Sequence, residues 1–430
     1  MYKGKAQKLL KNIDVGDRII VKKDDKSYEG ILMPRTELGD DEHIVIKLDN
    51  GYNIGIDYSR IDIKRIKKGA KIEIKSTPID IAYDKKKPDI TIMGTGGTIA
   101  SKVDYKTGAV HPSFSTEDLL NAVPELAKIA NIKTKVLFNI LSENMNPSYW
   151  IKIAHESANE LNSGTDGVVI AHGTDTMGYT AAALSFMLKG LGKPVVLVGS
   201  QRSSDRPSSD SVLNLISAVR VATSDIAEVV VVMHSSSSDG TCDIHRGTKV
   251  RKMHSSRRDA FRSINTIPLG RVGEKIEVFQ DYNKRSDNKV KSDDKFEDKV
   301  ALVKIYPGIK PGVLDFFISN NKGIVLEGTG LGHVPEELLN SIQRAKEVGK
   351  PVVMATQTLH GTVDMKVYST GRELLERGVI SARDMLPETA YIKLMHVLGQ
   401  TTDYEKVKKL MQTNIAGEFS GTTRVDTFPI

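Results

Sequence analysis

The sequence predicts an α/β protein with two lobes, each built on a largely parallel sheet, preceded by a small antiparallel β-barrel. Residues 1–88 alternate apolar and polar side chains over short runs, the pattern of half-buried antiparallel strands. From Asp89 onward, short continuous apolar runs alternate with helix-length segments, which indicates parallel strands buried on both faces. A charge-rich stretch at 281–299 interrupts this second region, so we expect one lobe on each side of it.

These changes in pattern set the expected domain limits. They are a small β-barrel domain over 1–75, a linker over 76–88, an N-terminal α/β lobe over 89–280, a charged linker over 281–299 and a C-terminal α/β lobe over 300–430.

Five alternating runs in the first region predict the strands of the barrel. Strands of this length, separated by turn residues, are typical of small antiparallel barrels. Asn50-Gly51 is the strongest local signal, because both central positions of a tight hairpin turn need a positive φ. The five runs are 18–22, 28–32, 43–47, 52–56 and 61–65.

Seven apolar runs after Asp89 predict the buried strands of the two lobes. They are 90–93, 167–171, 194–198, 229–234, 301–305, 323–327 and 351–355. In open α/β sheets, ligands bind outside the carboxyl ends of the strands. The residues that immediately follow each strand are therefore the first candidates for a functional site.

Composition limits the class of protein. Of 430 residues, 39% are hydrophobic and 27% are charged, which is typical of a globular protein. No apolar run approaches the ~18 residues that span a bilayer, and the first residues lack the apolar core of a secretory signal. The single cysteine, Cys242, excludes an internal disulfide and a cysteine-ligated metal site. We expect a cytoplasmic protein without a metal site.

The net charge of +7 comes mainly from the N-terminal region. Residues 1–88 hold 20 lysines and arginines against 15 acidic residues. A mild basic bias of this kind suits an RNA or an acidic partner, but a solvated surface has the same composition.

A glycine-rich loop, Gly94-Thr-Gly-Gly-Thr-Ile-Ala100, follows the first α/β strand. Its three glycines let backbone approach a ligand closely and leave the hydroxyl of Thr98 accessible. A phosphate cradle or a plain tight turn are the alternatives. The phosphate alternative is disfavoured, because the spacing is not G-x-G-x-x-G and no G-K-[ST] follows.

The second strand ends in Ala171-His-Gly-Thr-Asp-Thr-Met177, which places Thr174 beside the carboxyl group of Asp175. The alternative role for these residues is a helix N-cap, since an apolar helical stretch follows. A third motif is the basic run Lys249-Val-Arg-Lys-Met-His-Ser-Ser-Arg-Arg258, in which Lys252 is the candidate functional residue. Basic runs also occur as solvated faces or as contacts to tRNA or a protein partner.

Together these motifs resemble the bacterial-type L-asparaginases and glutaminase-asparaginases. The segments that carry the resemblance are GTGGTIAS, VVIAHGTDTM, VGSQRSSDRPSSDSVLNLISAV, KVRKMHSS, AFRSINTIPLG and GVISARDMLPETAYIKL, so that it spans about residues 89–415. It implies two asparaginase-like α/β lobes and an amide hydrolase whose nucleophile is a threonine.

The resemblance also implies roles for four catalytic residues. Thr98 would attack the side-chain carboxamide of the substrate and form an acyl-enzyme. Thr174, Asp175 and Lys252 would form a supporting relay, in which the lysine accepts a proton only while its amine is neutral. We expect Asp175 mainly to hold the α-ammonium group of the substrate and to orient the relay. The sequence leaves open which threonine attacks first.

Three further residues are candidates for substrate binding by the same resemblance. Tyr105 follows the nucleophile loop, where relatives place a tyrosine that contacts the nucleophile; a surface tyrosine in a turn is the alternative. Ser142 matches a serine that binds the substrate α-carboxylate, and Glu143 stands where relatives often have glutamine. His172 and His254 are interpreted as structural.

A small barrel before an asparaginase-like domain is similar to the ammonia-supplying subunits of the archaeal glutamyl-tRNA(Gln) amidotransferases. This resemblance implies that the barrel is SH3-like. This resemblance implies release of ammonia from glutamine or asparagine. A partner, the E subunit of such an amidotransferase, would bind Glu-tRNA(Gln) and convert it to Gln-tRNA(Gln) with ATP and Mg²⁺, so that this chain needs no cofactor. The resemblance further implies a homodimer of this chain within a heterotetramer.

Two other functions remain open. A free-standing L-asparaginase with an accessory N-terminal domain would hydrolyse amides fully without a partner. An RNA-binding or scaffold protein would use the barrel and the basic linker, but it has no need of Thr98, Thr174-Asp175 and Lys252 at strand ends.

Overall fold

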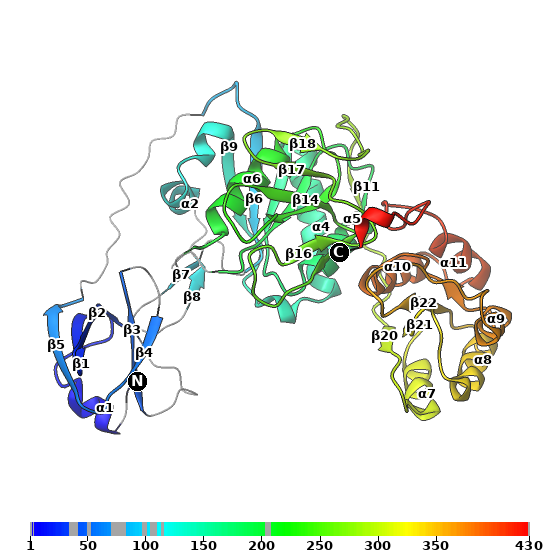
Figure 1. The fold of residues 1–430 in the computed structure, drawn as a ribbon. Helices are drawn as coiled ribbons and strands as arrows, with labels where there is room; N and C mark the ends of the chain where they lie inside the picture. Colours follow the sequence, from blue (N-terminus) through cyan, green and yellow to red (C-terminus); the bar gives the residue numbers. More distant parts are fainter. Residues whose placement is uncertain are drawn as a thin grey trace.

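The computed structural model describes residues 2, 4–33, 42–49, 53–69, 83–96, 101–103, 110–112, 116–202 and 208–428. In chain order it contains an N-terminal antiparallel sheet, a lobe around an eight-stranded sheet and a lobe around a four-stranded sheet (Figure 1). No helix in these ranges is long and apolar enough to cross a membrane.

The N-terminal sheet has the strand order β4-β3-β2-β1-β5. Alternate side chains of its strands, including Ile19, Val21 and Ile44, point inward and bury a small apolar core beneath helix α1. The strands are β1 (Arg18–Lys23), β2 (Lys26–Leu32), β3 (His43–Lys47), β4 (Asn53–Asp57) and β5 (Ile61–Lys67), and the helix is α1 (Gly4–Leu9). All five predicted strands are therefore confirmed.

Closure of this sheet into a barrel requires pairing of its edge strands, β4 and β5. Among the described residues no such pairing is found, so closure stays a prediction. The predicted turn at Asn50-Gly51 lies outside the described residues. Strands β3 and β4 pair antiparallel, with Lys47 opposite Asn53. A two-residue turn at Asn50-Gly51 in an unbroken ladder would place Lys47 opposite Ile54, so the register of the described residues differs by one from that of the predicted turn.

The second part is an eight-stranded sheet of order β18-β17-β14-β13-β12-β10-β6-β9. Its five parallel strands are β6 (Asp89–Gly94), β9 (Asn131–Val136), β10 (Gly167–Ala171), β12 (Val195–Val198) and β13 (Val229–His234). Three antiparallel strands extend it: β14 (Cys242–Arg246), β17 (Gly270–Val272) and β18 (Ile276–Val278). The mostly parallel sheet and its four predicted buried strands are confirmed.

Helices cover both faces of this sheet. Because side chains alternate along a strand, Val168 and Ile170 of β10 face one helix layer while Val169 and Ala171 face the other. The first layer contains α4 (Pro147–Asn162) and α5 (Met177–Met187), and the second contains α2 (Thr116–Ala122), α3 (Leu126–Ile129) and α6 (Ser211–Ala222). Burial on both faces explains why these strands are continuous apolar runs in the sequence.

The C-terminal lobe is a parallel sheet of order β20-β21-β22-β23. Its outer face is covered by α7 (Pro311–Asn320), α8 (Leu339–Glu347) and α9 (Ser369–Glu376), and its inner face by α10 (Pro387–Gln400). The strands are β20 (Val300–Lys304), β21 (Gly323–Gly328), β22 (Val352–Thr356) and β23 (Ile380–Ser381), and α11 (Tyr404–Met411) follows α10. The three strands predicted in this lobe are confirmed.

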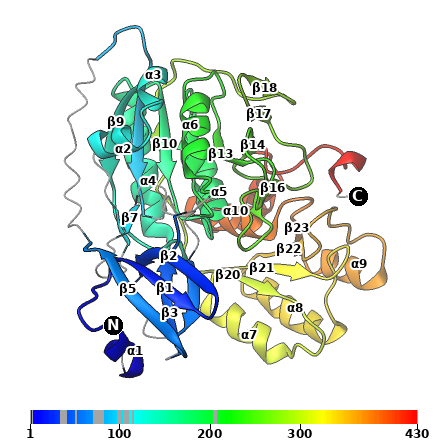
Figure 2. The ribbon, with the colours of Figure 1, turned by 60° about the vertical axis from the view of Figure 1, so that its left-hand side comes forward.

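Helix α10 joins the two lobes. It packs on α5 of the first lobe and on β20, β21 and β22 of its own lobe (Figure 2). The buried side chains of these elements form a single apolar core that runs through both lobes. The two lobes predicted from the sequence are therefore separate sheets that share one core.

Several short elements complete the fold. They are the pairs β7 (Ser101–Val103) with β8 (Val110–Pro112), β11 (Leu188–Lys189) with β19 (Lys291–Ser292) and β15 (Val250–Lys252) with β16 (Phe261–Ser263), and the 3₁₀ turns η1 (Ser142–Asn144), η2 (Glu336–Leu338) and η3 (Val425–Thr427). The predicted charged linker at 281–299 thus contains β19, which ties it to the first lobe. Most of the predicted linker at 76–88 lies outside the described residues, and the proposed domain limits stay predictions.

Candidate active site

The site is built at the carboxyl edge of the eight-stranded sheet, where β6 and β10 end side by side. Gly94 lies opposite Ala171 in the parallel register of these strands. Beyond it, both the backbone N–H and the hydroxyl of Thr95 donate to the carbonyl oxygen of Ala171, at 3.1 and 3.0 Å. The loop that continues toward Thr98 therefore starts beside the loop that carries Thr174.

A close contact of backbone with backbone fixes the start of the first loop. Gly96 has a φ of +114°, and a Cβ atom at this position would overlap the carbonyl oxygen of Ile140. Only glycine meets both conditions. Thr98 itself and Tyr105 lie outside the described residues, so their predicted roles as nucleophile and substrate contact stay predictions.

Lys252 contacts both predicted relay residues of the second loop. Its Nζ donates to Thr174 Oγ1 at 2.9 Å and to Asp175 Oδ1 at 2.7 Å. The lysine side chain is only 14% exposed, whereas that of Asp175 is 65% exposed. The structure thus brings Lys252 to two adjacent residues that lie 78 and 77 positions earlier in the chain, and it does so at the strand end where ligands bind in α/β sheets.

The structure also tests the alternative role of Thr174 and Asp175 as N-cap residues of the following helix. Helix α5 begins at Met177 and its N-cap residue is Thr176, which makes no side-chain capping bond and instead donates to the carbonyl oxygen of Ser142 at 2.7 Å. Thr174 and Asp175 lie before the cap and contact Lys252. They are therefore not the residues that cap the helix.

Ser142 and Glu143 lie next to the Thr174 loop, on the 3₁₀ turn η1. Ser142 is buried against Gly173, where an added Cβ would lie 2.7 Å from the serine Cβ. Glu143 is exposed on the same turn. The two predicted substrate contacts are thus placed beside the relay, one facing the loop and one facing solvent.

His172 is a buried support of the Thr174 loop. His172 Nδ1 lies 2.6 Å from the carbonyl oxygen of Gly173, and because a carbonyl oxygen only accepts, Nδ1 carries the proton of the neutral ring and donates it. His172 Nε2 is then an acceptor and receives the hydroxyl of Thr180 at 2.9 Å, while Thr180 Oγ1 accepts from Trp150 Nε1 at 3.0 Å. Burial lowers the pKa of His172 to about 4, so the ring is neutral and serves as a support.

His254 has a local structural role. Its Nδ1 accepts from the backbone N–H groups of Ser256 and Arg257, both at 3.1 Å, and so holds the turn that follows β15. The structural interpretation of both histidines agrees with these contacts.

The basic run around Lys252 is not a free positive surface. Each of four neighbouring cations contacts its own carboxylate, and two of these carboxylates belong to the C-terminal lobe. The pairs are Lys249–Asp384, Arg251–Glu388, Arg257–Asp259 and Arg258–Asp239, at 2.7, 3.3, 2.8 and 2.5 Å. The alternatives of a solvated face or a tRNA contact are therefore less well supported for this run.

One residue of the site was not singled out in the sequence. Gly199 directly follows β12, and a Cβ there would lie 2.8 Å from both the Thr174 Cγ2 methyl and the carbonyl oxygen of His172. The next residues, Gln201 and Arg202, donate their backbone N–H groups to the buried carboxylate of Asp210. The strand-end rule points to this segment, because it follows a predicted strand in the same way as the other two loops.

The described part of the chain contains no candidate metal centre. Within it, no group of three or more His, Cys, Asp or Glu side chains could hold a metal ion.

Comparisons with known protein families match most of the chain in three pieces. Family models match residues 13–66 (GatD N-terminal domain), 89–284 (Asparaginase, N-terminal) and 299–411 (Glutaminase/Asparaginase C-terminal domain). Among solved structures, the thermostable L-asparaginase from Thermococcus kodakarensis superposes with a TM-score of 0.70 and 37% identity, covering 78% of this chain and 100% of that one. L-asparaginase I from Vibrio cholerae gives a TM-score of 0.69 and 34% identity, covering 78% of this chain and 99% of that one.

The two lobes and the site at the carboxyl edge of the eight-stranded sheet thus define an amide hydrolase of the asparaginase type. Relatives that match over almost the full length narrow the class. The D subunit of glutamyl-tRNA(Gln) amidotransferase from Pyrococcus horikoshii is 58% identical over 97% of this chain and 98% of that protein, and the one from Methanothermobacter thermautotrophicus is 52% identical over 99% of each. The chain belongs to the family of glutamyl-tRNA(Gln) amidotransferase D subunits.

Proposed function

We propose that this chain releases ammonia from glutamine or asparagine and supplies it to a partner subunit that amidates Glu-tRNA(Gln). The observation that carries the proposal is the contact of Lys252 with Thr174 and Asp175 at the carboxyl edge of the sheet. The loop that leads to Thr98 begins beside the end of β10, next to the start of the loop that carries Thr174. Family membership adds a tRNA-dependent amidotransferase as the setting for the reaction.

The first chemical step forms an ester on a threonine. The Thr98 oxygen attacks the side-chain carboxamide carbon, and its proton passes to a neighbouring base. The tetrahedral intermediate collapses with cleavage of the C–N bond, and the nitrogen takes up a proton and leaves as ammonia. In the second step water attacks the ester carbon and gives a proton to the base. The C–O bond to Thr98 then breaks, the Thr98 oxygen takes up that proton, and the free acid leaves.

We propose that Thr174, Lys252 and Asp175 take part in the proton transfers of these steps. Thr174 lies in hydrogen-bond contact with the lysine amine, which is the geometry needed for proton exchange between a hydroxyl and a nitrogen base. Asp175 orients the amine through a second bond and, at 65% side-chain exposure, presents carboxylate to the solvent side where a substrate α-ammonium group would arrive. Ser142, Glu143 and Tyr105 are proposed as the remaining substrate contacts.

The chain acts with a partner amidotransferase subunit. We propose that this partner is the E subunit of the amidotransferase, that it binds Glu-tRNA(Gln), and that it carries the ATP and Mg²⁺ chemistry, so that this chain works without a cofactor. A homodimer of this chain within a heterotetramer, in the cytoplasm, is the proposed assembly.

A free-standing L-asparaginase with an accessory domain is the second candidate. It is favoured by the superposition on L-asparaginases, which covers 78% of the chain. Two observations favour the amidotransferase subunit. Residues 13–66 match a domain model named for the amidotransferase, and relatives with that name match over 97% of the chain.

Ammonia release from glutamine, measured with and without the partner and Glu-tRNA(Gln), separates the two candidates. The amidotransferase function predicts hydrolysis that rises sharply when both are present, together with formation of Gln-tRNA(Gln). Full hydrolysis by the isolated chain, unchanged by either addition, would instead support the free-standing asparaginase. If no ammonia is released from glutamine or from asparagine under any of these conditions, both candidate functions are contradicted.

A further inference from the structure

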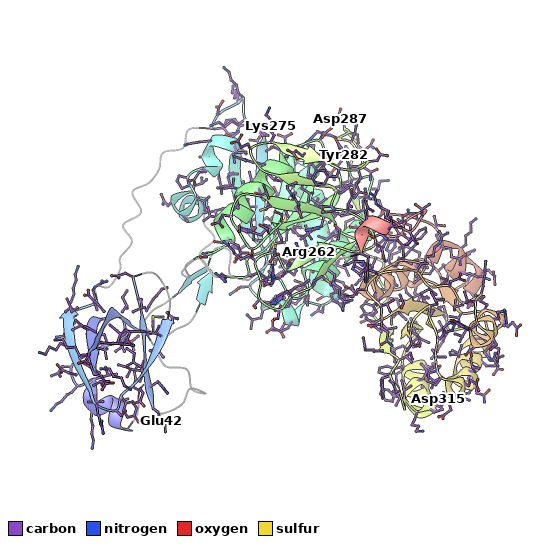
Figure 3. All side chains as sticks on the ribbon, viewed as in Figure 1. Glu42, Arg262, Lys275, Tyr282, Asp287 and Asp315 are labelled. Atoms are coloured by element: carbon purple, nitrogen blue, oxygen red, sulfur yellow. The ribbon has the colours of Figure 1, made fainter. Side chains whose placement is uncertain are left out.

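Lys249 and Arg251, which precede Lys252, bind the C-terminal lobe, although β15 itself belongs to the first lobe. Strand β15 lies outside both large sheets, and among the described residues its one partner strand is β16, where Arg251 is opposite Arg262, labelled in Figure 3. A three-stranded or larger sheet would fix its position, but a ribbon of two three-residue strands leaves the placement of Lys252 dependent on other contacts.

Those contacts come from the first turn of helix α10 and from Asp384, just before the helix. Lys249 Nζ donates to Asp384 Oδ2 at 2.7 Å, and the lysine and aspartate side chains are 2% and 10% exposed. Arg251 Nη1 donates to Glu388 Oε2 at 3.3 Å, and that carboxylate is 9% exposed. Thr389, the next residue of α10, donates its hydroxyl to the carbonyl oxygen of Thr248 at 2.9 Å.

The other half of the relay is held by the same helix. Thr174 and Asp175 directly precede α5, and α5 packs along α10 in the shared core. Helix α10 therefore supports both sides of the Lys252 contact: the strand that carries the lysine and the helix whose start carries its partners.

The charges around Glu388 make Arg251 its principal partner. Burial raises the pKa of Glu388, and the neighbouring carboxylate of Glu327 acts in the same direction, whereas Arg251 opposes both. Tyr179 of α5 faces the same cluster, and burial raises its pKa to about 12, so it stays neutral. Glu327 is itself paired with Lys304 at 3.2 Å.

We propose that Arg251 and Glu388 are positioning residues, through which the C-terminal lobe sets the place of the Lys252 amine against Thr174. This inference rests on the proposed role of Lys252. Neither residue touches the reacting atoms. Their pairing fixes β15 from the side opposite to Lys252, since neighbouring residues of a strand point to opposite faces.

The test is steady-state hydrolysis of glutamine by the full chain in complex with its partner. For Glu388→Gln we expect kcat to fall by about 10- to 100-fold, the loss typical of a reacting group displaced by about an ångström. KM should change by less than about threefold, because substrate binding does not depend on the lysine position. Arg251→Met should behave like Glu388→Gln, and Arg251→Lys, which keeps the charge, should restore most of kcat.

The matched control is Glu228→Gln, which breaks a buried carboxylate–arginine pair within the first lobe. Glu228 accepts from Arg246 at 2.8 and 3.0 Å and is as buried as Glu388. It should lower the thermal unfolding midpoint by a similar amount without changing kcat. If Glu228→Gln and Glu388→Gln lower kcat equally, or if Glu388→Gln leaves kcat unchanged, the positioning role is overturned.

A double variant separates this inference from the role of Lys252. In a Lys252→Ala background, Glu388→Gln should cause no further loss, because the group that it positions is gone. An additive further loss would overturn the inference alone. If Lys252→Ala by itself leaves kcat unchanged, the proposed function of the lysine fails, and the positioning role falls with it.

Discussion

At the scale of single residues, the contact between Lys252 and the Thr174–Asp175 pair is the feature that the account depends on. The sequence led us to expect that Asp175 mainly holds the substrate α-ammonium group and orients the relay. In the structure its carboxylate is 2.7 Å from the lysine amine, the contact that the second role requires. Both roles of Asp175 stay predictions.

Removal of the Thr174 hydroxyl tests the relay. Thr174→Val keeps the shape of the side chain but loses the oxygen that accepts from Lys252, so kcat for glutamine hydrolysis should fall by about 10²- to 10⁴-fold. KM should stay within a few-fold, and Thr174→Ser should retain most of the activity because it keeps the oxygen. Steady-state ammonia release measures both, and a valine variant with normal kcat would exclude the hydroxyl from the mechanism.

The buried His172 ring predicts a pH dependence of stability. Its pKa is about 4 in the folded chain and ~6.5 in an unfolded one, so the unfolded state takes up the proton first as the pH falls. The stability contributed by the neutral ring is thus complete above ~6.5 and is lost progressively toward pH 4, by about 3 kcal/mol in total.

A non-titrating variant isolates this effect. The unfolding free energy of His172→Gln should fall less steeply than that of the unchanged protein between pH 6.5 and 4, since the glutamine has no proton to take up. His245 and His396, whose pKa values burial also lowers to about 4, are present in both proteins and cancel in the comparison. Parallel curves from denaturant titrations would show that His172 is not held neutral by the fold.

Sequence reasoning found the three relay residues but not their supports. Thr174 and Asp175 follow a recognisable strand and Lys252 lies in a motif that matches a family, so local pattern was sufficient. The carboxylates that bind Lys249 and Arg251 are 135 and 137 positions away. No local pattern indicates such pairs, and the basic run therefore looked like an exposed face.

At the scale of elements, the carboxyl ends of β6, β10 and β12 lie side by side at the site. Gly199, directly after β12, contacts the loop that carries Thr174. Gly199→Ala would place a Cβ 2.8 Å from the Thr174 methyl and from a backbone oxygen, so the loop must shift. We expect kcat to fall at least about tenfold, because a small displacement of a reacting group is costly. Gly312→Ala in α7, where the added Cβ meets open space, is the matched control and should leave kcat unchanged.

Steady-state ammonia release from glutamine tests this prediction. An alanine at 199 with unchanged kcat would show that the Thr174 loop accommodates the methyl group without moving the relay.

The strands that the sequence predicted and those that it missed differ in burial. Strands β10 and β13 are buried at every position and stand out as apolar runs. Strand β9, Asn-Ile-Lys-Thr-Lys-Val, lies at the sheet edge with its lysines on the carboxylates of α4, so it has no apolar run to detect. Strand β15 has three residues, too few for any periodicity to show.

At the scale of the whole molecule, the two lobes share one core while the N-terminal sheet has its own. The sequence predicted two lobes from the charged stretch at 281–299, but the α10–α5 contact that unites them depends on packing between distant helices. We therefore expect the lobes to unfold together and the N-terminal sheet to unfold separately.

Calorimetry of the full chain tests this division. Leu394→Ala in α10 removes a fully buried side chain of the shared core and should destabilise both lobes in one transition, by about 2–5 kcal/mol. Ile46→Ala, equally buried in the N-terminal sheet, should shift only the other transition. Separate transitions for the two lobes after Leu394→Ala would contradict a common core.

The central claim is that a threonine activated beside Lys252 forms a covalent intermediate with the substrate. The most direct measurement is peptide mass mapping after reaction with a glutamine analogue that carries an electrophile in place of the carboxamide. We predict modification of Thr98, protection by excess glutamine and strong slowing in Lys252→Met. Modification that maps to neither Thr98 nor Thr174, or that proceeds at an unchanged rate in Lys252→Met, would contradict the account.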